Sequence, residues 1–209
     1  MLQITKSKRT RKAPLPFTTS TLQQEASKVL NFSTQKTMKL AQQLYEGIDI
    51  KSKGTMALIT YLRTDSTRVS DEADKAAREF IKSNYSEKYV AQAQAKSSTG
   101  TKIQDAHEAI RPVDISLTPV FVKDLISRDL FRLYQLIWKR FCASRMSDAV
   151  YSTLSVKIKA GEYAFGLAGS NLLFDGFLSV YTDGEDDNPT DKNLEALKEK
   201  DRLLLKIHS

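Results

Sequence analysis

The sequence predicts an α+β protein in which a mainly helical domain is inserted into a discontinuous β domain. Residues 20–147 mostly show apolar side chains at the spacing of three and four that marks amphipathic helices. Residues 148–182 mostly show the alternation of strands, and residues 1–19 carry two prolines that oppose a helix. We therefore expect a helical domain over 20–147 and a β domain made of 1–19 together with 148–209. Both connecting chains would pass through one hinge.

The first half of the helical domain carries three helix starts. Ser20 with Gln23, and Thr21 with Gln24, each fit a capping box, which predicts a helix from about residue 20. A second helix is predicted from Ser33 or Thr34 to Gly47, and a third from Ser70 onward, with acids in its first turn. Between them, 49–54 reads as a polar loop and 56–59 as a short buried strand.

The second half contains a loop, the best helix and then the strands. The pattern dissolves over 83–102, which predicts a mobile loop. Thr118-Pro119 is a helix start, and the apolar and aromatic stripe from Leu130 to Cys142 follows at helical spacing. Strands are predicted on both sides of a turn at 161–162, and 203–207 also alternates.

Composition narrows the class of protein. The chain has 209 residues, 41% hydrophobic and 27% charged, which suits a soluble protein of one large or two small domains. No apolar run approaches the roughly 18 residues that span a bilayer, and no secretory signal is visible. The single cysteine, Cys142, excludes an internal disulfide and suits the cytoplasm. We expect no membrane association.

Charge is unevenly distributed. Lysine and arginine number 32 against 25 acids, a net charge of +7. Residues 6–12 hold five of the cations, whereas 183–191 holds five acids. The basic segment suits a polyanion such as nucleic acid, and a solvated linker or arm explains it equally well.

The stretch from Thr60 to Ser70 is the first whose residue types suggest catalysis. It places Tyr61 near Arg63 and Asp65, and continuation of the strand would put all three on one face. A phenol oxygen can attack a phosphodiester while a guanidinium binds the phosphate oxygens. A half-buried strand tyrosine beside a surface arginine is the alternative.

The second such stretch is 104–112. It holds His107, one of two histidines, between Asp105 and Glu108, with Arg111 before a proline. A histidine can donate to a phosphate or relay a proton, or it can simply bond a neighbouring carboxylate.

Taken together, these stretches resemble type IA DNA topoisomerases. Leu58–Ser66 resembles the active-site tyrosine motif of that family, and Asp105–Pro112 resembles its Ala-His-Glu-Ala-Ile-Arg-Pro motif. Pro16–Ser27 and Leu133–Met146 resemble the segments that enter and leave the tyrosine-bearing domain, and the form of the first is closer to bacterial topoisomerase I. Ala57 and Val113 depart from the glycine and threonine common there.

The resemblance implies roles for individual residues. Tyr61 would be the nucleophile that takes the 5′ phosphate of a cleaved strand, Arg63 would hold that phosphate, and His107 would contact it. A supporting part in DNA binding would fall to Thr60, Asp65, Ser66 and Arg111.

The resemblance also implies parts that this chain lacks. The family carries a TOPRIM domain whose acids hold Mg²⁺, and this sequence has no Asp-x-Asp motif in a strand context. We therefore expect a fragment, inactive alone, that holds the tyrosine-bearing helical domain and the arch β domain and works with the remaining domains of its polypeptide. Its partners would be single-stranded DNA and negatively supercoiled DNA, and its location the bacterial cytoplasm, in association with the nucleoid. The alternative is a non-catalytic module that binds single-stranded nucleic acid.

Overall fold

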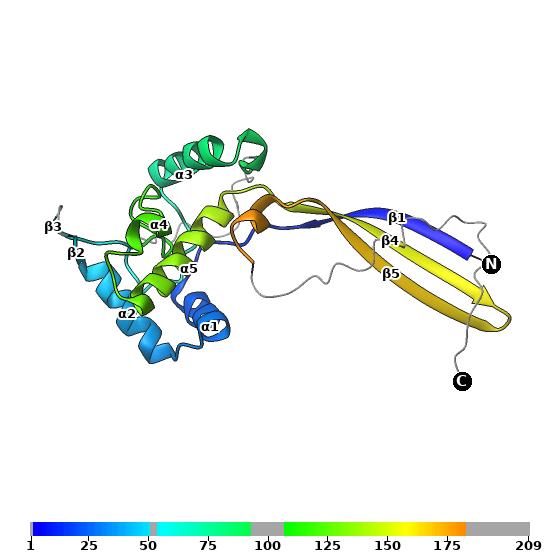
Figure 1. Cartoon of the computed structure of the whole chain (residues 1–209), viewed down its shortest axis with the longest axis horizontal. Coiled ribbons are helices and arrows are strands. Elements are labelled where there is room, and N and C mark those ends of the chain that lie inside the picture. Colours follow the sequence, from blue (N-terminus) through cyan, green and yellow to red (C-terminus); the bar gives the residue numbers. More distant parts are fainter. Residues whose placement is uncertain (1, 51–53, 93–106, 183–209) are drawn as a thin grey trace. The chain divides into compact units, whose positions relative to one another are not determined.

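The computed structural model describes residues 2–50, 54–92 and 107–182, and it confirms the α+β class. The chain divides into two compact units (Figure 1). The described part of the first, here called the sheet unit, comprises 2–11 and 149–175. The described part of the second, the helical unit, comprises 12–148, with its two gaps, and 176–182. No helix in the described ranges has the length and apolar character needed to cross a membrane.

The sheet unit contains a three-stranded antiparallel sheet in the order β1-β4-β5. The strands are β1 (Leu2–Arg11), β4 (Ala149–Ala160) and β5 (Tyr163–Phe174), and a tight turn at Gly161 joins the last two. The predicted strands and turn are confirmed. The basic segment, for which a linker was one interpretation, lies within β1 except for Lys12, and β1 pairs with β4 over residues 2–11.

The two faces of this sheet differ. Leu154 and Val156 are buried on one face, and Ile4 and Ile158 pack against them. Residues one position along each strand point to the opposite face. There, the Ser7 and Thr153 hydroxyls lie 2.6 Å apart, and the guanidinium of Arg9 lies 4.9 Å from the centre of the Tyr151 ring.

The helical unit begins with α1 (Thr19–Leu30) and α2 (Thr34–Glu46). The helix predicted near residue 20 is present, but its capping box joins Thr18 to Thr21 rather than the pairs predicted from the sequence. For α2 the predicted ends are confirmed, with Ser33 as N-cap and Gly47 at positive φ as C-cap.

The remaining helices are α3 (Asp71–Asn84), α4 (Pro119–Val122) and α5 (Arg128–Ser144), with single 3₁₀ turns at Glu87–Tyr89 and Gly176–Ser179. Ser70 caps α3 and Thr118 caps α4, as predicted. The helix that starts at Pro119 is only one turn long, so the predicted apolar stripe belongs to a separate helix, α5.

The core of the helical unit forms around α5, whose buried residues include Leu133, Ile137 and Phe141. Tyr134 and Trp138 are buried too, and their polar atoms donate to the carbonyls of Leu117 at 2.6 Å and Ile115 at 2.9 Å. The aromatic stripe therefore packs the interior and fastens the 115–117 loop.

Two predictions for 49–59 were wrong. The expected polar loop is a hairpin of β2 (Ile48–Ile50) and β3 (Gly54–Met56), although 51–53 lie outside the described residues. The expected buried strand over 56–59 is absent from the structure as described, since β3 ends at Met56 and only Ile59 forms an isolated bridge, to Pro112. Leu58 and Ile59 are nevertheless fully buried, because side-chain burial requires no ladder. The predicted loop at 83–102 and the strand at 203–207 lie partly or wholly outside the described residues.

Arg140 on α5 joins the beginning and end of the helical unit. Its guanidinium donates to the carbonyl of Leu15 at 2.6 Å and to the hydroxyl of Tyr181 at 3.0 Å, and it lies over the ring of Phe17. The Tyr181 hydroxyl in turn donates to Glu25 on α1 at 2.9 Å.

The return of the chain into the helical unit depends on a glycine. Gly176 has a φ of 49°, and a Cβ there would collide with the backbone carbonyls of Ser147 and Asp148. Close beside it, the Phe177 amide donates to the Ser147 carbonyl at 3.0 Å. This hydrogen bond therefore holds together the chain just before the excursion into the sheet unit and the chain just after it.

Candidate functional site

The segment from Thr60 to Ser66 lies across the helical unit without regular secondary structure, yet its side chains alternate in burial. Tyr61 is 38% exposed, Leu62 only 1%, Arg63 is exposed again, and Thr64 is buried. The sequence-based expectation that Tyr61, Arg63 and Asp65 share one face thus agrees with their exposure, although no strand produces it.

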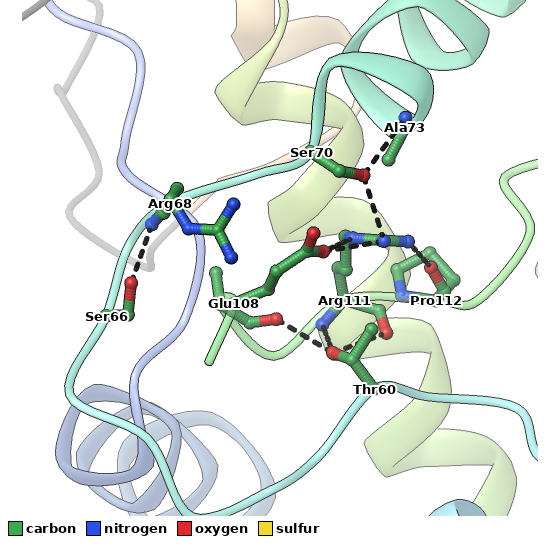
Figure 2. Close-up of polar contacts among 9 residues, drawn as sticks. Thr60, Ser66, Arg68, Ser70, Ala73, Glu108, Arg111 and Pro112 are labelled. Carbon is green, nitrogen blue, oxygen red and sulfur yellow. Dashed lines mark hydrogen bonds and ion pairs between the residues drawn. The ribbon is translucent and has the colours of Figure 1, made fainter. Parts of the chain in front are cut away.

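Thr60 fastens the residue before the tyrosine. Its hydroxyl donates to the Ala109 carbonyl at 2.7 Å and accepts from the Arg111 amide at 3.0 Å, while its own amide donates to the Arg111 carbonyl at 2.9 Å (Figure 2). Because these bonds join the tyrosine segment to Ala109–Arg111, they bring the two chemical stretches of the sequence together.

Thr19, the first residue of α1, fastens the other side. Its hydroxyl donates to the carbonyl of Leu62 at 2.8 Å and accepts from the amide of Thr64 at 2.8 Å. The Thr19 amide donates to the Thr64 carbonyl at 2.8 Å. Leu62 and Thr64 are the neighbours of Arg63, so one threonine fixes the backbone on both sides of that arginine.

The tyrosine ring lies between two other rings. His107 stacks on Tyr61 with the ring centroids 5.1 Å apart and the planes at 29°. Tyr45, at the end of α2, meets Tyr61 edge-on at 5.5 Å. These contacts limit the directions in which the phenol can point.

Arg63 and Asp65 open onto a pocket of about 430 Å³ at the start of α1. Among the residues described, neither side chain has a hydrogen bond or ion pair, so the Arg63 guanidinium retains its five donors for a ligand. The pocket is lined by Thr19, Ser20, Gln23, Arg63, Thr64, Asp65 and His107.

Arg111 is held inside the protein. Its side chain is 11% exposed and makes two bonds, of 2.9 and 2.7 Å, to one oxygen of Glu108 (Figure 2). It also donates to the Pro112 carbonyl at 3.0 Å and reaches the Ser70 hydroxyl at 3.5 Å. The expected contact between Arg111 and DNA remains a prediction, and within this chain the guanidinium serves to hold Glu108–Pro112.

Ser66 and Arg68 complete the segment. The Ser66 hydroxyl is largely buried and accepts from the Arg68 amide at 3.2 Å (Figure 2). The Ser66 amide donates to the Thr64 hydroxyl at 3.0 Å. The Arg68 carbonyl accepts from the Ala109 amide at 2.8 Å, which ties this end of the segment to the histidine stretch as well.

The structure therefore brings Tyr61, Arg63, Asp65 and His107 to one exposed region and places Thr60, Ser66 and Arg111 in its support. Sequence reasoning missed Thr19 and Tyr45. Thr19 stands beside Ser20 and Thr21, which the sequence suggested as capping residues, and no signal marked Tyr45.

The described residues do not fit a Mg²⁺ site. No group of three histidine, cysteine or carboxylate side chains comes together in the part of the chain that the structure covers. Asp65 is the carboxylate that lines the pocket beside Arg63, and Glu108, next to His107 in the sequence, is bound to Arg111.

Comparison with known proteins places the chain in a family. A family model described as DNA topoisomerase matches residues 1–208. A solved structure of full-length topoisomerase I from Thermotoga maritima is 42% identical to this chain with a TM-score of 0.76. The similarity covers 85% of this chain and 28% of that one, so the chain spans little more than a quarter of the related protein. The chain belongs to the type IA DNA topoisomerase family, as its motifs predicted.

Proposed function

We propose that this chain is the tyrosine-bearing part of an ATP-independent enzyme that relaxes negatively supercoiled DNA by cutting, passing and rejoining one strand. The observation that carries this proposal is the exposed Tyr61, stacked on His107 and two residues from a guanidinium without a described partner, in a chain of this family.

In the proposed step, the Tyr61 oxygen attacks the phosphorus of a backbone phosphodiester. The new bond joins the tyrosine to the 5′ phosphate, the bond to the 3′ oxygen breaks, and that oxygen takes a proton as a 3′-hydroxyl. Attack by the same hydroxyl reverses the step and frees the tyrosine, so the energy of the phosphodiester is retained and no nucleotide cofactor is consumed.

Arg63 suits the phosphate oxygens, on which negative charge builds up during the transfer. His107, stacked on the tyrosine and lining the same pocket, is placed to contact that phosphate or its neighbour. We propose that Asp65 contacts DNA at the pocket rim, and that Thr60 and Ser66 support binding by fixing the backbone.

We further propose that Mg²⁺ acts in the whole enzyme on a TOPRIM domain outside this chain, where it would supply positive charge near the reacting phosphate. The 28% coverage of the related topoisomerase supports a larger polypeptide. Within it, residues 20–147 would form the domain that moves to open the DNA gate, and 1–19 with 148–209 the arch.

A reconstitution experiment tests this function. The chain alone, incubated with Mg²⁺ and supercoiled plasmid, should give no relaxation, because half of the proposed site is missing. Addition of the corresponding N-terminal part of the polypeptide should restore cleavage, trapped by denaturant as a protein joined to the 5′ end of DNA. Tyr61→Phe should abolish the adduct without weakening folding, because Phe keeps the ring contacts.

The second candidate, a non-catalytic DNA-binding module, predicts a different result. No adduct would form in the reconstituted mixture, and DNA binding would be unaffected by Arg63→Ala or His107→Ala. An adduct that persists in Tyr61→Phe would instead show that another residue is the nucleophile.

A further inference from the structure

The three strands of the sheet unit carry positive charge and no negative charge. Lysine and arginine occur six times in β1, β4 and β5, and aspartate and glutamate are absent from all three strands. A chain with 25 acids among 209 residues would place about four in 34 residues, so the strands are depleted in acids.

The strand register assigns four of these cations to one face. Arg9 lies opposite Tyr151, Arg11 opposite Ala149, and Lys157 and Lys159 lie two and four residues beyond Ser155 on β4. The other two, Lys6 and Lys8, lie opposite Leu154 and Ser152 and so point to the apolar face.

The same face presents a polar surface between its cations. Rows across the strands place Thr5 beside Ser155 and Ala168, and Ser7 beside Thr153 and Ser170. On β5 the alternate residues of this face from Ala164 to Ser170 are small, which lets an extended ligand approach the backbone, and the larger Leu172 follows opposite Tyr151. Thr5, Ser155 and Lys157 are exposed, whereas Leu154 and Val156 on the opposite face are buried.

We propose that this polar sheet face is a second DNA contact surface, separate from the Tyr61 region, that binds the backbone of duplex DNA without reading its sequence. The proposal goes beyond the cleavage reaction and depends on the proposed function only in taking DNA as the ligand. Cations and hydroxyl donors are the groups that bind phosphate oxygens in complexes of this kind.

The face lacks exposed aromatic rings on its described strands, and this favours duplex over single-stranded DNA as the ligand. Proteins that bind single strands stack bases on exposed aromatic rings. The aromatic residue of this face in the three described strands is Tyr151, which is 5% exposed and lies under Arg9. Tyr163 and Phe165 pair with Ala160 and Ile158 and belong to the other face.

The dimensions also suit a duplex. Lys157 lies six positions beyond Tyr151 on β4, a span of about 20 Å at the usual rise along a strand. Cations at both ends of such a span can reach the phosphates of roughly half a turn or more of B-DNA.

Salt dependence of binding provides the test. The probe is a 20-base-pair blunt duplex of arbitrary sequence, its affinity for the Tyr61→Phe chain measured by fluorescence anisotropy at several KCl concentrations. The logarithm of affinity falls with that of salt by about 0.9 per phosphate neutralised. Replacement of Lys157 and Lys159 by Gln should therefore reduce the slope by about 2.

The matched control is the double replacement of Lys6 and Lys8 by Gln, which removes the same charge from the same sheet on its other face. The control should change the slope by clearly less than the test pair. Circular dichroism should show both variants folded.

Either of two results would overturn the proposal. The first is that the two pairs reduce the slope equally. The second is that a 20-nucleotide single strand binds better than the duplex and loses more affinity in the Lys157/Lys159 variant. Failure of adduct formation in the reconstitution would leave this result unaffected.

Discussion

Threonine side chains determine how Tyr61 and Arg63 are presented. Thr60 and Thr19 each use one hydroxyl both to donate to a carbonyl and to accept from an amide, a double role that valine of the same shape cannot fill. Residues 61–64, which these two threonines hold, form no strand, so the threonine hydroxyls take the place of a neighbouring strand. The geometry of the candidate nucleophile therefore depends on two hydroxyl groups that are bound to the backbone.

The Thr19 contact gives a prediction at the residue scale. Thr19→Val leaves the Thr64 amide without its acceptor and should destabilise the chain by about 1–3 kcal/mol, measured by urea unfolding. Thr19→Ser retains the hydroxyl and should recover most of the loss. Equal losses in Val and Ser variants would show that the methyl group's packing, not the hydrogen bonds, matters here.

The sequence indicated the reactive residues but not their supports. Tyr61, Arg63 and His107 stand in short stretches whose residue types suggest phosphate chemistry. The bonds of Thr19, in contrast, cross 43 and 45 positions to Leu62 and Thr64, and no local pattern encodes such a distance.

At the scale of elements, Asp74 joins helix α3 to helix α5. Its carboxylate accepts from Arg78 on its own helix at 2.6 Å and from Arg145, at the C-cap of α5, at 2.9 Å. Burial alone would raise the pKa of Asp74, but hydrogen bonds and charge from the two arginines outweigh it, and the pKa is lowered.

This lowered pKa predicts an acid-dependent loss of stability. A carboxyl group that ionises more readily when folded contributes stability above its ordinary pKa of about 4 and loses it as pH falls through the lower folded value. Asp74→Asn should therefore destabilise the chain at pH 6, by about 1–3 kcal/mol, and less at pH 3. Urea unfolding at both pH values gives the comparison, and an equal loss at the two would exclude the ion pairs as its cause.

Helices were easier to predict than the short elements. Caps at Ser33 and Ser70 and the stripe of α5 are local signals, and the structure has helices there. The β2-β3 hairpin and the one-turn α4 contain too few residues for a period to show, and the Leu58–Ile59 run is buried without forming a strand ladder.

At the scale of the whole molecule, the only cysteine reports on the core of the helical unit. Cys142 is fully buried on α5, and burial raises the pKa of its thiol to about 12. The thiolate is the reactive form, so the folded chain should resist alkylation at pH 8.

Labelling of this thiol should therefore follow opening of the helical unit. Iodoacetamide should react slowly in buffer and faster as urea is added, with the rate tracking the fraction unfolded by Trp138 fluorescence. Because the unfolded thiol ionises near pH 9, stability should also fall as pH rises from about 9 toward 12. Rapid labelling in buffer at pH 8 would contradict the burial of Cys142.

The order of helical and β regions along the chain was predictable, but the pairing of strands was not. Alternation indicates a strand without naming its partner, and β1 pairs with a strand some 150 residues further on. The change of period near residue 148 was visible because a long helix ends there and a long strand begins.

The hydrogen bond between Ser147 and Phe177 has a consequence for how this chain can vary. Since those residues adjoin within the helical unit, the β4-β5 hairpin leaves and re-enters the helical unit at a single point. Lys12 and Ala13 both bind Asp148, so β1 departs from the same place. Insertions or deletions in the sheet can thus accumulate without displacing a helix, and relatives are free to differ in the length of their strands while keeping the tyrosine in place.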